Sequence, residues 1–307
     1  MKSAFLFPGQ ASQYVGMGKD LYDKFDAARR VFDSANEIMD IDLKKICFEG
    51  PEDELKKTYI TQPAIFVHST AVLRILQETG IEPQAAAGHS LGEYSALVAA
   101  GSLTFEDGLR LVKERGRLMY EAGIKQPGTM AAIIGLTPEQ VHELCNEVSK
   151  KGILQPANYN SPGQIAISGE VDAVHLGIEK AKEMGAKRAV ELVVSGAFHS
   201  PLMASAQEGL KEVLDQTEIK NAAVPVYSNV EAEPVEDADK IRDLLYQQLT
   251  KPVLWQNLAE NMIRDGIENF YEIGPGKVLK SLHKRIDRSS PCTEIGTAED
   301  IQKLGES

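Results

Sequence analysis

The sequence predicts an α/β fold with a central parallel sheet and a smaller subdomain inserted into it. An apolar run at Ser3–Phe7 stops at a Pro-Gly pair, which is typical of a buried strand that ends in a loop. A second run, Ala85–Ala87, leads into a glycine-rich turn and then into an Ala-, Leu- and Glu-rich helical segment. Residues 128–194 have a different character, in which two helical segments alternate with short apolar strands.

The glycine-rich turn has the pattern G-x-S-x-G, with Ser90 between Gly88 and Gly92. Between a strand and a helix, this pattern holds a serine hydroxyl in the open above the helix N-terminus, as in α/β-hydrolases. The serine then takes a strained backbone conformation, and the glycines avoid a collision between strand and helix. We therefore predict a nucleophilic Ser90 in an α/β-hydrolase-like core. The alternative is a chance match to a short pattern.

Periodicity predicts the other elements of the core. We expect helices over 19–38, 63–79, 103–119 and 277–288, and a closing strand over Asn269–Ile273. Pro63 would then lie in the first turn of its helix, where a missing N–H costs nothing. The loop Gly9–Gln13 follows the first strand, and loops at the carboxyl ends of parallel strands line the crevice of open α/β sheets.

Turn-forming residues delimit the inserted subdomain, namely Gln126-Pro127-Gly128 at its start and Ser195-Gly196 at its end. Inside it we expect strands over 130–134, 153–158, 164–168 and 188–194, with helices over 138–150 and 171–184. This β-α-β-β-α-β order is the split βαβ pattern of a ferredoxin-like unit. We therefore divide the chain into a catalytic core of residues 1–126 and 196–307 and an inserted subdomain of residues 127–195.

Composition limits the function classes. The net charge of −12 argues against nucleic-acid binding, which needs a basic surface. The three cysteines (Cys47, Cys145 and Cys292) are far apart and suggest neither a disulfide framework nor a zinc site. The N-terminal apolar run is too short for a signal peptide, and no segment approaches the length of a membrane span. We expect a cytoplasmic protein without a metal site.

A serine nucleophile needs a base, and the sequence offers six histidines. Among them, His199 lies on a loop between the inserted unit and the main body, where a cleft is expected. His89 adjoins Ser90, but neighbours on a tight turn point apart. The other histidines lie in expected helices, one in the core and three at the surface: His68, and His142, His175 and His283.

Several cations lie in the segment 103–119, and the simplest interpretation is a solvated basic face. A planar guanidinium can also hold a carboxylate through two parallel hydrogen bonds. The residues alone do not single out one cation for that role. The candidates are Arg110, Lys113, Arg115 and Arg117.

Six spaced motifs, taken together, resemble one family. The string GHSLGEYSALVAAG at 88–101 resembles the nucleophile motif of malonyl-CoA:acyl carrier protein transacylases and of the related acyltransferase domains of fatty-acid and polyketide synthases. FPGQASQYVGMG at 7–18 resembles the opening motif of that family. Further strings are similar to family motifs at matching spacing: TQPAIF at 61–66, NYNSPGQ at 158–164, AFH at 197–199 and YQQLTKPVLW at 246–255. The resemblance covers essentially the whole chain.

The resemblance implies roles for individual residues. Ser90 would be the nucleophile, and His199, 109 residues further on, the base. The backbone N–H groups of Gln10 and Leu91 would bind the oxyanion. Arg115, twenty-five residues after Ser90 and directly before a glycine, would hold the malonyl carboxylate.

The resemblance implies weaker assignments as well. The backbone carbonyl of Gln248 would orient His199 in place of the usual triad carboxylate. Asn160 would face the cleft, and Asn229 would lie just behind the catalytic groups. Phe198 matches the form that accompanies malonyl rather than α-methyl-branched substrates. To the TQPAIF helix we assign core packing and no chemistry.

The implied activity is transfer of a malonyl group from malonyl-CoA to the phosphopantetheine thiol of acyl carrier protein, through a malonyl-serine and without a permanently bound cofactor. Lysines and arginines of 277–288 could dock an acidic carrier, although a solvated helix face explains them equally well. Three alternatives stay open at this point: an acyltransferase serving a polyketide synthase, a serine hydrolase or thioesterase, and a non-catalytic binding scaffold.

Overall fold

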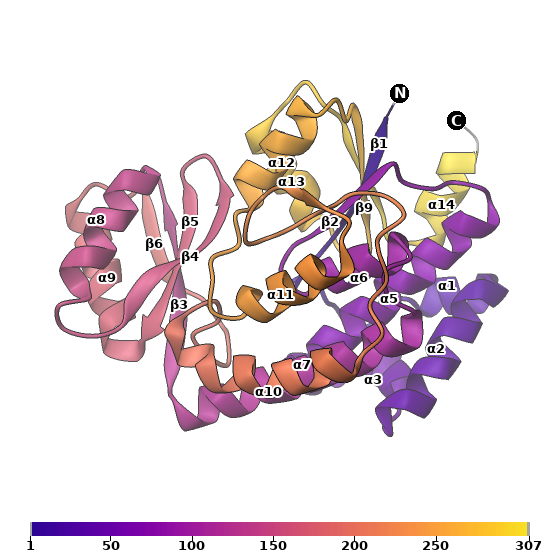
Figure 1. The fold of residues 1–307 in the computed structure, drawn as a ribbon, viewed down its shortest axis with the longest axis horizontal. Helices are drawn as coiled ribbons and strands as arrows, with labels where there is room; N and C mark the ends of the chain where they lie inside the picture. Colours follow the sequence, from indigo (N-terminus) through magenta and orange to yellow (C-terminus); the bar gives the residue numbers. More distant parts are fainter. Residues whose placement is uncertain (1, 306–307) are drawn as a thin grey trace.

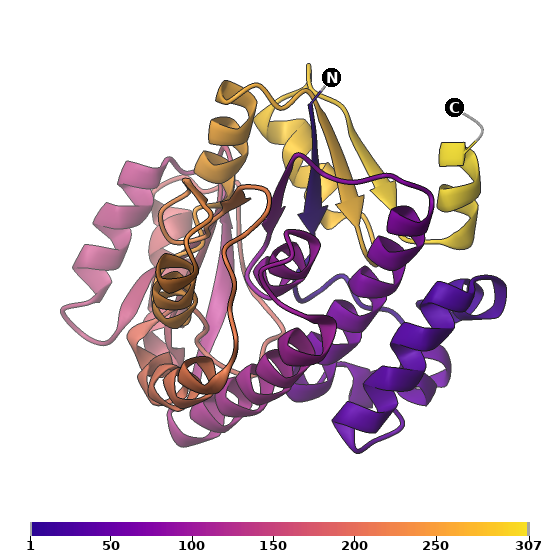
Figure 2. The same ribbon diagram turned by 45° about the vertical axis from the view of Figure 1, so that its right-hand side comes forward.

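The computed structural model describes residues 2–305, and within that range the larger of two sheets has six strands. Their order is β10-β9-β1-β2-β7-β8, and every pair except β7–β8 is parallel. Figure 2 shows the indigo β1 beside the gold strands β9 and β10. The bounds are β1 Ser3–Phe7, β2 Ala85–Gly88, β7 Val226–Tyr227, β8 Pro234–Val235, β9 Asn269–Ile273 and β10 Cys292–Ile295. The central parallel sheet predicted from the sequence is confirmed.

Helices cover both faces of this sheet (Figure 1). Phe5 and Phe7 of β1 pack into one apolar core with α2, α5, α6 and α7, whereas Ala4 and Leu6 pack into a second core with α12 and α13. The alternation follows from the two-residue period of a strand. The bounds are α1 Lys19–Lys24, α2 Asp26–Met39, α3 Leu43–Glu49, α4 Glu52–Leu55, α5 Thr58–Glu78, α6 Gly92–Ala99, α7 Phe105–Lys125, η1 Pro201–Met203, α10 Ala204–Gln216, α11 Ala238–Gln248, α12 Trp255–Arg264, α13 Val278–Ile286 and α14 Ala298–Gly305.

The second sheet is antiparallel and lies at the left of Figure 1 with α8 and α9. Its order is β4-β5-β3-β6, the arrangement of a ferredoxin-like unit. The bounds are β3 Gly128–Ile134, α8 Pro138–Val148, β4 Leu154–Ser161, β5 Gln164–Glu170, α9 Val171–Glu183 and β6 Arg188–Glu191. The separate antiparallel sheet is therefore confirmed, while the exact division into domains stays a prediction.

Strand β4 also hydrogen-bonds to a segment of the core outside its own sheet. The Tyr159 N–H donates to the Val253 carbonyl at 2.9 Å, and the Val253 N–H donates to the Ala157 carbonyl at 2.8 Å. A side-chain hydrogen bond of 2.6 Å between Thr58 and Ser195 adds a contact between α5 and the strand-to-helix connection after β6. These bonds hold the end of β4 against the segment that follows α11, so both sheets contribute to the site described below.

Several expected elements have different bounds in the structure; the helix expected over 103–119, for example, is Phe105–Lys125. The helix expected over 19–38 breaks at Phe25, whose extended backbone (φ −125°, ψ 125°) lets α1 and α2 pack separately. Pro63 lies inside α5 rather than in its first turn, because the helix begins at Thr58. Almost all of α5 is buried, and that packing outweighs the lost backbone hydrogen bond. Strand β6 ends at Glu191, and Val193 is fully exposed in the connection that follows.

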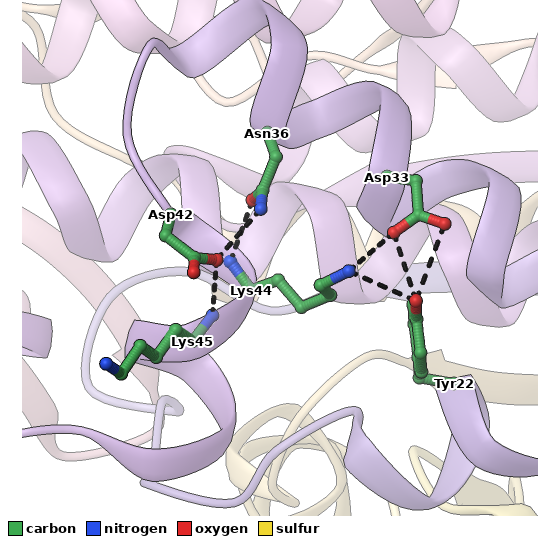
Figure 3. Close-up of polar contacts among 6 residues, drawn as sticks. All are labelled: Tyr22, Asp33, Asn36, Asp42, Lys44 and Lys45. Carbon is green, nitrogen blue, oxygen red and sulfur yellow. Dashed lines mark hydrogen bonds and ion pairs between the residues drawn. The ribbon is translucent and has the colours of Figure 1, made fainter.

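Side-chain hydrogen bonds fasten the N-terminal helices to one another (Figure 3). The Asp42 carboxylate caps α3 by accepting the Lys45 N–H at 3.0 Å, and it also accepts from Asn36 at 2.8 Å. Lys44 reaches back to Asp33 on α2 at 2.6 Å. The hydrogen bond from the Lys45 backbone amide holds the pKa of the Asp42 carboxyl below its usual value. The cap is thus a local stabilising device at the entrance to α3.

Residues 2–305 contain neither a candidate membrane-spanning helix nor a candidate metal cluster. No helix there is both long enough and apolar enough to traverse a bilayer. No cluster of three or more His, Cys, Asp or Glu side chains in that range could hold a metal ion.

Candidate active site

Ser90 lies at the sharp turn between β2 and α6, with a positive φ of 51°. A Cβ on Gly88 would come within 1.8 Å of the Gly92 carbonyl carbon, and a Cβ on Gly92 within 2.0 Å of the Phe7 carbonyl oxygen. Only glycine fits at those two positions, so strand and helix close tightly on either side of the serine. The G-x-S-x-G pattern therefore forms a tight strand-to-helix turn with Ser90 at its tip.

His199 lies in the connection between β6 and η1, also with a positive φ of 57°. Its Nε2 lies 2.9 Å from Ser90 Oγ, and its Nδ1 lies 2.8 Å from the Gln248 carbonyl oxygen. A carbonyl only accepts, so Nδ1 carries the ring proton and Nε2 is left to accept the serine hydroxyl. The orienting partner is a neutral carbonyl, as the resemblance implies, and not the carboxylate of a hydrolase triad.

The imidazole of His199 is neutral over the physiological range. Burial and, to a smaller extent, the nearby Arg115 guanidinium lower its pKa to about 3, against the opposing hydrogen bond to Gln248. A neutral ring in contact with a hydroxyl can take its proton.

Arg115 projects from α7 and is fully buried. Its Nη1 donates to Gln62 Oε1 at 2.7 Å, and its Nη2 donates to Gln248 Oε1 at 2.8 Å and to Ser90 Oγ at 3.0 Å. These acceptors are all neutral, and Nε has no partner within residues 2–305. Burial lowers the pKa of this group, although a guanidinium stays charged in proteins. A buried cation with spare donors is a suitable receptor for an anion.

The loop after β1 lies against the Ser90 turn. The His89 N–H donates to the Phe7 carbonyl at 2.9 Å, and a Cβ on Gly9 would lie 2.5 Å from the His89 carbonyl oxygen. Gln10 follows in this loop, while Leu91 directly precedes α6 and is buried. Within residues 2–305, the backbone N–H groups of Gln10 and Leu91 donate to no acceptor. Both amides therefore keep an unused hydrogen-bond donor within the described part of the chain.

Two asparagines contact the turn. Asn229, after β7, accepts the Ser90 N–H at 2.6 Å and donates to the Gly88 carbonyl at 2.7 Å, so it spans the turn from behind. Asn160 on β4 hydrogen-bonds the His89 ring at 2.8 Å. The centroid of the His89 ring lies 5.4 Å from that of the Trp255 ring, so His89 is not placed as the base. Phe198 is buried beside His199.

Sequence reasoning missed two buried residues of this network, Gln62 and Glu93. Gln62 was assigned to core packing, yet it hydrogen-bonds Arg115. Glu93, in the first turn of α6, accepts from Gln248 Nε2 at 2.6 Å and from the Asn229 N–H at 3.3 Å. Burial raises the pKa of Glu93 to about 7. The available signal was a polar residue within an otherwise apolar, buried stretch.

The expectation that His283 lies at the surface is wrong. His283 is 1% exposed, packs 4.2 Å from the Phe270 ring and hydrogen-bonds Ser290. The amphipathic face of α13 turns it inward, and it has no contact with the site.

Comparisons with known proteins agree with this geometry. The family described as acyl transferase domain matches residues 4–304. The malonyl CoA-acyl carrier protein transacylase of Bacillus subtilis is 48% identical over 302 residues, which is 98% of this chain and 95% of the relative. An acyl-carrier-protein-S-malonyltransferase from Bartonella henselae superposes with a TM-score of 0.96 at 43% identity, covering 100% of this chain and 99% of that one.

A further structure contains a type II polyketide synthase acyl carrier protein in complex with its malonyl-transacylase. It superposes with a TM-score of 0.96 at 41% identity and covers 100% of both chains. The family match and the full-length identities lead to one conclusion. The chain belongs to the acyl transferase domain family.

Proposed function

We propose that this enzyme transfers the malonyl group of malonyl-CoA to the phosphopantetheine thiol of acyl carrier protein, through a malonyl ester on Ser90. One observation carries the proposal. Ser90 Oγ lies 2.9 Å from a neutral imidazole nitrogen and 3.0 Å from a buried guanidinium. The base and the anion receptor thus both contact the oxygen of the nucleophile, Ser90 Oγ.

In the first half-reaction, His199 Nε2 takes the Ser90 proton as Oγ attacks the thioester carbonyl carbon. The resulting oxyanion is bound by the backbone N–H groups of Gln10 and Leu91, which have no acceptor among residues 2–305. The C–S bond then breaks, and the CoA sulfur leaves as a thiol with the proton from His199.

In the second half-reaction, His199 takes the proton of the carrier thiol, and the sulfur attacks the malonyl ester. The C–O bond to Ser90 breaks, and Oγ regains its proton from His199. The two halves share one base and one oxyanion site, which gives ping-pong kinetics. The Gln248 carbonyl keeps the His199 ring in the same tautomer throughout, because the proton on His199 Nδ1 stays in its hydrogen bond to that carbonyl.

Arg115 would bind the free carboxylate of the malonyl group. Its acceptors in residues 2–305 are neutral amide and hydroxyl oxygens, so a carboxylate would be the stronger partner. Phe198, buried beside His199, would restrict the space for an α-methyl branch. No step requires a metal or a bound cofactor.

The carrier would dock on the exposed basic residues of α13 and the segments on either side. Lys284 and Arg288 are exposed, whereas Lys280 pairs with Glu294 and Arg285 donates to Gln164. The double variant Lys284→Glu/Arg288→Glu should raise the KM for the carrier, with Lys24→Glu/Lys45→Glu on the far helices as the matched control. An unchanged carrier KM would remove α13 from the docking surface.

We place this activity in the cytoplasm, in the supply of malonyl units for fatty-acid elongation. An acyltransferase serving a polyketide synthase would have the same chemistry and a different carrier, and it stays the second candidate.

Kinetics with malonyl-CoA and holo-carrier test the activity itself. We expect parallel lines in double-reciprocal plots. Rapid release of free malonate without carrier would instead indicate a thioesterase.

A further inference from the structure

Glu93 is a buried carboxyl group that the proposed mechanism does not use. It is 3% exposed and lies three residues after Ser90, in the first turn of α6. Its Oε2 accepts hydrogen bonds from Gln248 Nε2 and from the Asn229 N–H. A carboxyl kept in the interior without a salt bridge costs stability, so its contacts need an explanation.

The Gln248 side chain connects Glu93 to the anion receptor. Its Nε2 donates to Glu93 Oε2 at 2.6 Å and to the Ser90 carbonyl at 3.0 Å, so both amide protons have acceptors. Its Oε1 is therefore turned toward Arg115, which donates to it at 2.8 Å. A flipped amide would point its NH₂ at a guanidinium and its oxygen at a carboxylate, and both contacts would be repulsive.

The Glu93 carboxylate thus accepts a hydrogen bond from the Gln248 amide, and that amide in turn accepts one from the Arg115 guanidinium. Glu93 makes no hydrogen bond or close ion pair with Arg115; besides the attraction of their opposite charges, it acts on that residue through the Gln248 amide. Gln248 also bonds the Ser90 carbonyl, so the orientation of one amide group fixes the guanidinium relative to the nucleophile. Without the Glu93 acceptor, the two amide orientations would be closer in energy, and the guanidinium would lose a fixed partner.

We propose that Glu93 is a positioning residue whose carboxylate fixes the Gln248 amide, so that Arg115 is held ready for a carboxylated acyl group. The preference for malonyl over acetyl groups then depends on Glu93. The inference rests on the proposed function, since it assumes that Arg115 binds the malonyl carboxylate.

The test compares two variants of the full-length enzyme. Glu93→Met removes the acceptor at similar size, whereas Glu93→Gln keeps an oxygen that can accept from Gln248. The measurement is kcat/KM for malonyl-CoA and for acetyl-CoA. In Glu93→Met we expect the malonyl-to-acetyl ratio to fall about tenfold, the effect of one lost hydrogen bond to a charged group. Glu93→Gln should restore most of the ratio.

A merely structural role would lower both activities by the same factor in Glu93→Met and leave the ratio unchanged, which would overturn the inference. Should Glu93→Met not fold, Gln248→Met keeps the backbone carbonyl and removes the amide. The same loss of ratio is then expected, and an unchanged ratio would contradict the inference. Failure of the wild type to form a malonyl-serine would instead contradict the proposed function.

Discussion

At the scale of single residues, the Ser90 hydroxyl combines two opposite contacts. It donates its proton to His199 Nε2 and accepts from Arg115 Nη2, at 2.9 and 3.0 Å. The guanidinium therefore favours negative charge on Oγ before substrate arrives. Once a malonyl carboxylate binds, the same guanidinium can turn its donors to the stronger anion. One cation thus serves the nucleophile and the substrate in turn.

Replacing Arg115 should change acyl selectivity. In Arg115→Ala the carboxylate loses a charge-assisted, two-point partner, and malonyl transfer should fall by about 10²-fold or more relative to acetyl transfer. Arg115→Lys should recover only part of this loss, because an ammonium lacks the planar pair of donors. Competition between malonyl-CoA and acetyl-CoA measures the ratio. A preserved preference for malonyl in Arg115→Ala would contradict the role of receptor.

The ionisation of His199 makes a prediction about pH. Because burial lowers its pKa to about 3, the ring stays neutral from pH 8 down to pH 5, and acylation should not fall over that range on its account. Rapid-mixing measurement of the first half-reaction in Glu93→Gln checks this, since that variant removes the carboxyl whose pKa is about 7. An inflection near pH 6.5 would show an ordinary histidine.

The lowered pKa of His199 also makes the folding stability of the protein depend on pH. Below about pH 6.5 the unfolded chain gains a proton on this histidine that the folded chain does not. The contribution of His199 to the free energy of unfolding is therefore complete above pH 6.5 and declines as pH falls toward 3.

The sequence predicted part of this residue network. The glycine pattern around Ser90 has a local cause, and the loop position of His199 follows from the order of elements. The Gln62 side chain meets Arg115, and the Glu93 side chain meets that of Gln248, across long separations in the chain, so each looks ordinary in its own segment. A hydrogen bond between residues 155 positions apart leaves no periodic trace in a sequence.

At the scale of elements, the start of α6 packs tightly against the end of β1. Gly92 allows the helix to begin directly against the Phe7 carbonyl, where a Cβ would lie 2.0 Å away. This contact fixes the Ser90 turn to the neighbouring strand, and hence to the loop that carries Gln10. The nucleophile and the oxyanion donors are thereby held by backbone packing.

Gly92→Ala should consequently destabilise the protein by about 3 kcal/mol, the upper part of the range for overpacking a close contact. Gly305→Ala is the matched control, because a Cβ there would meet open space. Urea denaturation followed by circular dichroism gives both values. Equal stability of the two variants would show that strand and helix do not pack as closely as described.

Regular elements were more predictable than their interruptions. The strands Ser3–Phe7 and Asn269–Ile273 match the structure residue for residue, because buried parallel strands are short apolar runs. The break at Phe25 and the early start of α5 depend on which side chains the rest of the fold buries. Those boundaries are set by tertiary packing, which local propensity does not report.

At the scale of the whole molecule, hydrogen bonds connect the antiparallel sheet to two connecting segments of the core. Val253 exchanges backbone hydrogen bonds with β4, and Gln155 on β4 donates to the His199 carbonyl at 2.7 Å. The position of the base therefore depends on the antiparallel sheet, although the base itself lies outside it. A relative shift of the sheets would move His199 away from Ser90.

These contacts predict that both sheets unfold in one transition. The fluorescence of Trp255, the single tryptophan, reports on the core beside the parallel sheet. Hydrogen exchange of residues 128–170 in urea reports on the antiparallel sheet. The two probes should give the same midpoint. Earlier loss of protection in residues 128–170 would mean that the inserted sheet unfolds independently.

The covalent intermediate gives the most direct measurement of the proposed chemistry. The enzyme is incubated with malonyl-CoA, its intact mass is recorded, and the modified peptide is sequenced before a chase with holo-carrier or with buffer. We expect one malonyl group on Ser90 that moves to the carrier thiol and persists in buffer, and no adduct in Ser90→Ala. An adduct on another residue, or none on the wild type, would contradict a malonyl-serine mechanism.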